Sequence, residues 1–205
     1  MIVQLIYVCV LYVIIVWSKK SSLMYPKENI SYDDFVKKAK TGDIFLTYSS
    51  KNFFSYIHSL IMFSPITHAS LIVKHNDDIY MFESGAPRGV QLRKLKEYLM
   101  EGADYAWLMS FDISDKHRSV IQLEMEKISN KAYDWNFLKS SDLTGYDSPY
   151  QSEELGFSCA DLVVEVLYKS KILKQKKKIF PKQFLDNSLD FLKKPSFPLN
   201  ILFNK

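Results

Sequence analysis

Residues 67–84, THASLIVKHNDDIYMFES, are the stretch that decides the fold. Two runs rich in apolar and β-branched residues flank a short polar turn, and this pattern predicts a β-hairpin. Side chains alternate across a strand, so His68 shares one face of the first strand with Ser70 and Ile72. In an antiparallel hairpin the end of the second strand returns toward the start of the first, which brings Glu83 near His68.

The segments on either side of the hairpin predict further strands and several helices. Two apolar runs, IFLTY and YAWLMSF, are typical of strands, and VQLRKLKEYL begins extended and becomes helical. A Ser-capped segment that ends at a glycine, and two segments with apolar residues at helical spacing, predict helices within residues 31–43, 51–63 and 115–133. Residues 139–156 are rich in Ser, Asp and Gly and predict a long loop. Strands in the middle of the chain with helices around them indicate an α+β fold.

A second informative stretch, FSCADLVVEVLY at residues 157–168, has the pattern of a capped apolar helix. Ser158 is a favourable N-cap, and Asp161 three residues later resembles a capping box. Cys159 then occupies the first helical position, where the helix dipole and the free backbone amides favour an anion and can stabilise an oxyanion. The alternative is a small buried thiol without a chemical task, which is common for cysteine.

A thiolate nucleophile needs a base, and His68 is the best placed of the four histidines. It opens a strand of apolar and small residues, whereas His58 lies in a helical segment and His75 and His117 lie in polar segments that suit solvated side chains. Glu83, at the end of the next strand, can fix the imidazole tautomer and stabilise its charged form. Each residue taken alone also has a structural interpretation. Because a thiol at a helix start, a strand histidine and a carboxylate one strand later occur together, a catalytic role is favoured over three separate structural roles.

In this order the motifs resemble the permuted NlpC/P60 papain-like proteins, in the group that contains bacterial YiiX-like proteins and relatives from poxviruses and other large viruses. Five pieces between about residue 41 and residue 168 carry the resemblance: TGDIFLTYSS, SPITHASLIV, YMFESGAPRGVQLRKL, KAYDWNFL and FSCADLVVEVLY. In this group the histidine strand and the acidic strand precede the cysteine helix, as they do here. One departure is Ala160 followed by Asp161, where the family often has Ser and then Glu.

The resemblance implies a circularly permuted papain-like α+β fold, in which the cysteine helix packs on a small antiparallel sheet. It also implies a cysteine hydrolase or acyltransferase acting on an amide or an ester, with Cys159 as nucleophile, His68 as base and Glu83 orienting the base. The Cys159 amide and the strand end at Tyr48 and Ser49 are candidate oxyanion donors. No cofactor or metal is expected, because one cysteine and one strand histidine are too few for a zinc site.

The start of the chain predicts a membrane anchor. Residues 2–17, IVQLIYVCVLYVIIVW, carry no charge, and as a helix they span about 24 Å, close to the ~30 Å hydrocarbon core. Lys19 and Lys20 follow at the interface and favour a cytosolic globular part. A cleaved signal peptide, which makes the protein a secreted one, and a buried core helix or strand are the alternatives. The expected organisation is an anchor at 1–20, a linker at 21–30 and a catalytic domain at 31–205.

Composition limits the classes of partner. The net charge is +4, from 27 basic and 23 acidic residues that are interspersed, so nucleic-acid binding is not expected. The two cysteines, one in each half of the chain, do not make a disulfide framework. The anchor, the aromatic residues 52–65 and the lysine-rich residues 169–178 suit the lipid bilayer of a host or virion membrane, with a lipid or peptide substrate. The alternative class is a catalytically idle, membrane-tethered structural or binding module.

Overall fold

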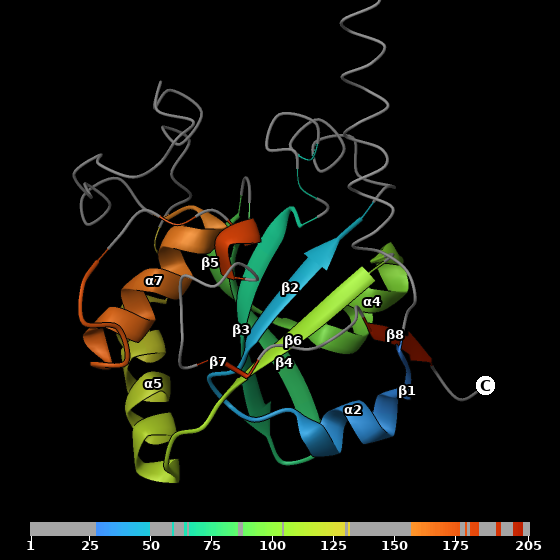
Figure 1. Cartoon of the computed structure of the whole chain (residues 1–205), viewed down its shortest axis with the longest axis horizontal. Coiled ribbons are helices and arrows are strands. Elements are labelled where there is room, and N and C mark those ends of the chain that lie inside the picture. The colour runs from blue at the N-terminus through green and yellow to red at the C-terminus, as the bar shows by residue number, and fades with distance from the viewer. Residues whose placement is uncertain are drawn as a thin grey trace, which may run out of the picture.

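A mainly antiparallel sheet with helices on both of its faces organises the chain (Figure 1). The computed structural model describes residues 28–49, 59, 64, 66–85, 88–103, 105–129, 131, 157–176, 179, 181–184, 192–193 and 199–202. Every structural statement below refers to these residues.

Five antiparallel strands form the centre of the sheet, in the spatial order β6, β2, β3, β4, β5. Their bounds are β2 (Ile44–Tyr48), β3 (His68–His75), β4 (Asp78–Gly85), β5 (Gly89–Lys94) and β6 (Tyr105–Phe111). The predicted hairpin is confirmed as β3 and β4, with Leu71 opposite Phe82. Beyond β6 the sheet continues with β8 (Leu199–Leu202) and β1 (Glu28–Ser31), which run parallel to each other, and β7 (Leu192–Lys193) pairs with the far end of β6.

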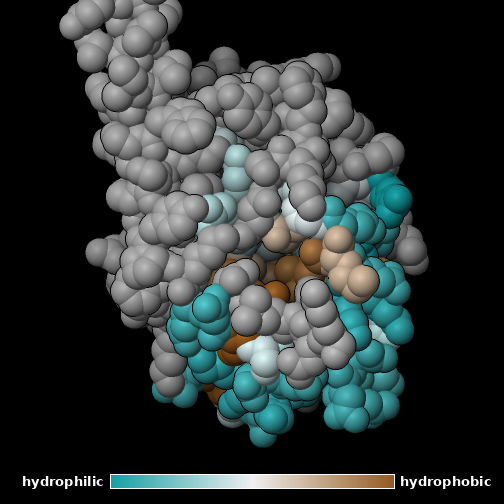
Figure 2. Space-filling model, turned by 90° about the vertical axis from the view of Figure 1, so that its right-hand side faces the viewer, coloured by the Kyte–Doolittle hydropathy of each residue, from teal (hydrophilic) through white to brown (hydrophobic). Residues whose placement is uncertain are grey.

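Two pairs of helices enclose the sheet. One face carries α7 (Cys159–Lys169) and α5 (Asp115–Ile128), and the other carries α2 (Tyr32–Lys38) and α4 (Leu95–Gly102); a short 3-10 helix, η2 (Pro181–Phe184), follows α7 (Figure 1). Because side chains alternate along a strand, Leu46 and Leu71 join the core beneath α7, while Phe45 and Ile72 join the core beneath α2 and α4. On the side seen in Figure 2 hydrophobic side chains gather near the middle, and hydrophilic ones lie below and to the right of them. The expected α+β architecture, with the cysteine helix packed on an antiparallel sheet, is confirmed.

Short-range signals in the sequence account for the helix starts. The predicted N-cap Ser31 accepts a hydrogen bond from the Asp34 amide at 3.0 Å, and α2 begins at the next residue. The turn between α2 and β2 contains Gly42, whose φ of +89° suits glycine. A Cβ at this position would lie 2.8 Å from Ile121 Cδ1 of α5, so the absence of a side chain also lets α5 approach the sheet.

The linker predicted for residues 21–30 does not reach residue 30, because Glu28, Asn29 and Ile30 belong to β1 and pair with β8 near the other end of the chain. The predicted anchor, most of the helix predicted at 51–63 and the loop predicted at 139–156 lie outside the described residues. In the part of the chain that the structure describes, no helix has the length and apolar character needed to cross a membrane.

Candidate active site

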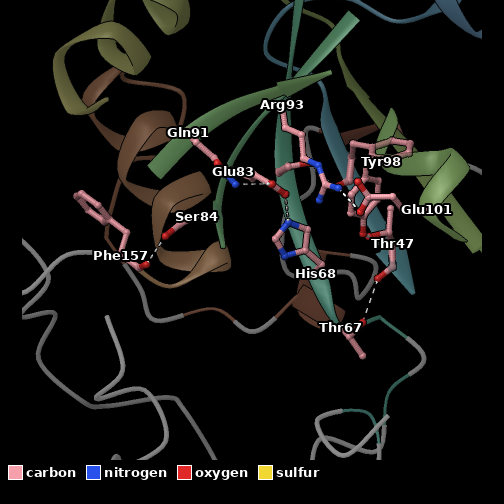
Figure 3. Close-up of polar contacts among 12 residues, drawn as sticks. Thr47, Thr67, His68, Glu83, Ser84, Gln91, Arg93, Tyr98, Glu101 and Phe157 are labelled. Carbon is pink, nitrogen blue, oxygen red and sulfur yellow. Dashed lines mark hydrogen bonds and ion pairs between the residues drawn. The ribbon is translucent and has the colours of Figure 1, made fainter. Parts of the chain in front are cut away.

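The hairpin brings His68 and Glu83 into direct contact. His68 lies opposite Thr47 at the start of β3, and Glu83 lies near the end of β4, so both side chains project from the same sheet face. His68 Nε2 is 2.7 Å from Glu83 Oε2, as Figure 3 shows. The carboxylate side chain is 4% exposed and the imidazole is 19% exposed, so the pair is largely buried and the imidazole is its more accessible member.

The surroundings of Glu83 favour its ionised form. Burial raises the pKa of this carboxyl and is the largest single effect. The hydrogen bond to His68 and its charge, the charge of Arg93 and the hydrogen bond from Gln91 Nε2 at 3.2 Å outweigh burial, so the pKa of Glu83 is lowered. The group opposite His68 is therefore a carboxylate at neutral pH.

Cys159 stands at the first position of α7, as the capping pattern predicts. Ser158 Oγ accepts a hydrogen bond from the Asp161 amide at 3.3 Å and donates one to Asp161 Oδ2 at 2.5 Å. The first intrahelical bond runs from the Leu162 amide to the Ser158 carbonyl, so the amide of Cys159 has no partner within the helix. The thiol is free and half-buried, whereas the next eight residues of the helix are buried.

His68 connects the thiol to the carboxylate. Burial acts most strongly on this imidazole and lowers its pKa, but hydrogen bonds to Cys159 and Glu83, with the charges of both groups, raise the pKa well above 6.5. Nε2 faces Glu83, which leaves Nδ1 as the nitrogen for Cys159. The imidazole can therefore take a proton from the thiol while Glu83 stabilises the imidazolium.

Four polar residues around this pair were not anticipated from the sequence. Tyr98 of α4 stands beside His68 with ring centroids 6.3 Å apart, and its hydroxyl is 2.6 Å from Thr47 Oγ1. The Arg93 guanidinium lies 5.0 Å from the Tyr98 ring centroid and forms an ion pair with Glu101. Burial raises the pKa of Tyr98, so the phenol stays neutral beside the histidine. No local pattern in β5 or α4, both of which carry several polar residues, marked these positions, because their contacts depend on the tertiary fold.

The other candidate residues occupy different surroundings. The Ser49 hydroxyl donates to the Gly102 carbonyl at 2.7 Å, and Tyr48 is buried in the core beneath α7 with its ring 6.2 Å from that of Tyr105. Their role as oxyanion donors stays a prediction. His75 and His117 are exposed, as expected for solvated side chains, and His58 lies outside the described residues.

Comparison with known proteins places this arrangement in a recognised fold. The crystal structure of the metalloprotein yiiX from Escherichia coli O157:H7 superimposes with a TM-score of 0.58 and 16% sequence identity, over 78% of this chain and 98% of that one. This chain has the YiiX fold. The resemblance to YiiX-like, permuted papain-like proteins is thereby confirmed at the level of the fold. No protein-family model matches the sequence, and no curated protein does either.

The chemistry of this YiiX-fold chain has to be argued from its own residues. Among the described residues, no three His, Cys, Asp or Glu side chains come together around a point that could hold a metal ion. What the described part of the chain offers is an imidazole paired with a buried carboxylate, and a half-buried thiol at the start of α7 that affects the pKa of the imidazole.

Proposed function

We propose that this protein is a cysteine hydrolase or acyltransferase that cleaves an amide or an ester bond. The observation that carries the proposal is the pair of His68 and Glu83, joined at 2.7 Å, together with the effect of Cys159, which helps raise the pKa of His68. A nucleophile, a base and a group that orients the base are what thiol acyl-transfer chemistry requires. The YiiX-type papain-like fold supports the same class of reaction.

The reaction runs in two stages. His68 accepts the proton of Cys159, and the thiolate attacks the carbonyl carbon to form a tetrahedral adduct, whose oxyanion receives a hydrogen bond from the Cys159 amide. The adduct collapses to a thioester, and the leaving amine or alcohol takes its proton from the His68 imidazolium. Water or an alcohol or amine acceptor, deprotonated by His68, then attacks the thioester and releases the acyl group. Glu83 stays ionised throughout and holds the imidazole in place.

The membrane is the setting that we propose for this reaction. Residues 2–17 are the anchor in this proposal, and extraction of membranes with alkaline carbonate tests it, since an anchored chain stays in the pellet. Two lysines of the described residues 169–176 also have partners within the protein. Lys169 and Lys176 lie 2.9 Å and 2.8 Å from the buried Glu165 carboxylate, and the two ion pairs link the segment after α7 to the helix.

The first test asks whether Cys159 forms a covalent acyl intermediate. The full chain, purified in detergent with Cys9→Ser so that Cys159 is its only thiol, is treated with a panel of fluorescent acyl esters that includes a phospholipid ester and an N-acyl peptide. We expect one acyl group per chain, bound in a thioester that hydroxylamine cleaves at neutral pH. Cys159→Ala should take up none. A Cys159 thiol that reacts no faster than free cysteine with every member of the panel would favour a catalytically idle module.

A second prediction concerns Arg93 and the acid limit of the reaction. The groups that face Glu83 are His68 from β3, Gln91 and Arg93 from β5, and Tyr98 and Glu101 from α4. Because the charge of Arg93 lowers the pKa of Glu83, Arg93→Gln should raise that pKa. The carboxylate then takes up a proton at higher pH, so the acidic limb of the rate profile of Cys159 acylation shifts to higher pH.

Two variants separate the charge of Arg93 from its packing. Arg93→Lys keeps the positive charge but loses the planar guanidinium, so its acidic limb should stay close to that of the wild type. Arg88→Gln removes an exposed charge that acts on Glu101, and it should leave the limb in place. An equal shift in Arg93→Lys and Arg93→Gln would show that the charge on residue 93 does not act on Glu83.

A further inference from the structure

Strand β4 presents two adjacent polar residues to opposite faces of the sheet. Glu83 projects toward α4 and meets His68, whereas Ser84 projects toward α7. Ser84 Oγ donates a hydrogen bond of 2.5 Å to the Phe157 carbonyl, across 73 positions of the chain. Both residues are buried, and Figure 3 shows the Ser84–Phe157 pair to one side of the strand, apart from the His68–Glu83 pair.

The Phe157 carbonyl belongs to the peptide bond that leads into the cysteine helix. A hydrogen bond to its oxygen fixes the orientation of this peptide plane relative to β4. Ser158 follows as the N-cap, tied to Asp161 at both of its Oγ hydrogen bonds, and Cys159 is the next residue. No rotatable side chain intervenes between the anchored carbonyl and the backbone of the nucleophile, so the place of the Cys159 Cα depends on this contact.

Strand β4 therefore helps to determine the positions of both groups in the proposed proton transfer, the imidazole and the thiol. Its residue 83 locates the imidazole through Nε2, and its residue 84 locates the start of the helix that carries the thiol. The packing of α7 against β3 and β4 holds the helix as a whole, but it allows small shifts of the first turn. A shift of about 1 Å between reacting groups can cost about a hundredfold in rate, so the first turn is where precision matters.

We propose that Ser84 is a positioning residue, which holds the Phe157 carbonyl so that the Cys159 thiol faces His68. This inference rests on the proposed function, since it assigns Ser84 a part in the alignment of the same nucleophile and base. Ser84 itself touches no reacting atom. In this proposal Ser84 controls the distance and the angle between the Cys159 sulfur and His68 Nδ1.

The test measures the second-order rate of iodoacetamide alkylation of Cys159 in the folded full chain carrying Cys9→Ser. Ser84→Ala should slow alkylation about ten- to a hundredfold at neutral pH. The matched control is Ser70→Ala: Ser70 is equally buried on β3, and its Oγ donates to the Phe45 carbonyl at 3.2 Å, away from α7. Ser70→Ala should lose stability to urea as Ser84→Ala does, with alkylation little changed.

A shape-matched pair covers the case in which Ser84→Ala does not fold. Ser84→Thr and Ser84→Val add the same volume to a buried site, but only threonine keeps the hydroxyl. Alkylation should be at least tenfold faster in Ser84→Thr than in Ser84→Val. Equal rates in this pair, or equal slowing in Ser84→Ala and Ser70→Ala, would overturn the inference.

A double substitution separates positioning of the thiol against His68 from any other effect. If Ser84 acts by aligning Cys159 with His68, then Ser84→Ala should have almost no further effect on alkylation in a His68→Asn background. If Ser84→Ala slows alkylation by the same factor in the His68→Asn background as in the wild type, the alignment role is rejected. If His68→Asn by itself leaves alkylation unchanged, the proposed function fails; if it slows alkylation while Ser84→Ala does not, only the role of Ser84 fails.

Discussion

Replacing His68 with asparagine should lower the rate of Cys159 acylation by about 10²- to 10⁴-fold, the range that a general base contributes. Among the described residues, His68 is the base whose pKa Cys159 raises, and Nδ1 is its nitrogen that does not face Glu83. Asparagine can still donate to Glu83, so the buried carboxylate keeps a partner and the fold is preserved. The asparagine amide cannot accept the thiol proton. The lower acylation rate therefore reflects the missing base and not a disturbed fold.

The pH profile of the variant tests the assigned role. Burial lowers the pKa of His68, but hydrogen bonds to Cys159 and Glu83 outweigh it and raise the pKa well above 6.5. The charged imidazole that forms when His68 takes the thiol proton is therefore favoured to higher pH than that of an ordinary histidine. The stability that this raised pKa contributes is complete below about 6.5, the ordinary value for histidine, and is lost as the pH rises through the folded-state value. In His68→Asn the remaining reactivity should increase steadily in alkaline solution, since a thiol without a base must ionise by itself.

An exposed histidine supplies the control for this prediction. His117→Asn alters an exposed side chain on α5 whose Nδ1 lies 2.8 Å from Ser114 Oγ, a residue of the same helix start. Its acylation rate should match the wild type. Rates for His68→Asn and His117→Asn within a factor of two of each other would exclude His68 as the base.

The sequence predicts the hairpin and the capped cysteine helix because both depend on contacts between near neighbours. Alternation along β3 and an antiparallel return are enough to bring Glu83 to His68, and two residues, Ser158 and Asp161, define the start of α7. No local pattern predicts that Cys159 lies near His68. That prediction depends on the order of the motifs in the chain and on the resemblance to a known fold.

Residues that reach the site from other elements could not be predicted in the same way. Tyr98 reaches His68 only because α4 folds back over the sheet, and Arg93 depends on the register between β4 and β5. Ser84 meets Phe157 across a separation that no periodicity reveals. The pairing of β1 with β8 joins the two ends of the described chain. Because the partner strand is so distant in sequence, no local pattern distinguishes Ile30 from the linker predicted before it.

The turn into β2 carries the second large prediction, which concerns stability. Asp43 is fully buried, and its carboxylate accepts hydrogen bonds from Arg118 Nη1 at 2.9 Å and from Ser110 Oγ at 3.0 Å. The same guanidinium donates to the carbonyls of Thr41 and Phe111 at 2.7 Å and 2.8 Å. One side chain of α5 thus binds three points around the start of the sheet.

Replacing Arg118 with methionine should lower the free energy of unfolding by about 3–5 kcal/mol, because it leaves a buried carboxylate without its counter-ion. Urea unfolding at neutral pH measures the loss. The control is Lys116→Met, which removes an exposed positive charge from the same helix and should change the free energy of unfolding by less than about 0.5 kcal/mol. The double variant Asp43→Asn with Arg118→Met should recover part of the loss, since the asparagine carries no charge.

The pH dependence distinguishes an unpaired charge from a packing defect. Burial raises the pKa of Asp43, and the hydrogen bonds and charge of Arg118 oppose it, so Arg118→Met should raise that pKa further. A carboxyl with a raised folded-state pKa destabilises the protein as the pH rises through that value, and the effect vanishes once the carboxyl is protonated. The cost of Arg118→Met should therefore shrink in mildly acidic solution. A loss of the same size at both pH values would assign it to the packing of the side chain and would exclude the charge of Asp43 as its cause.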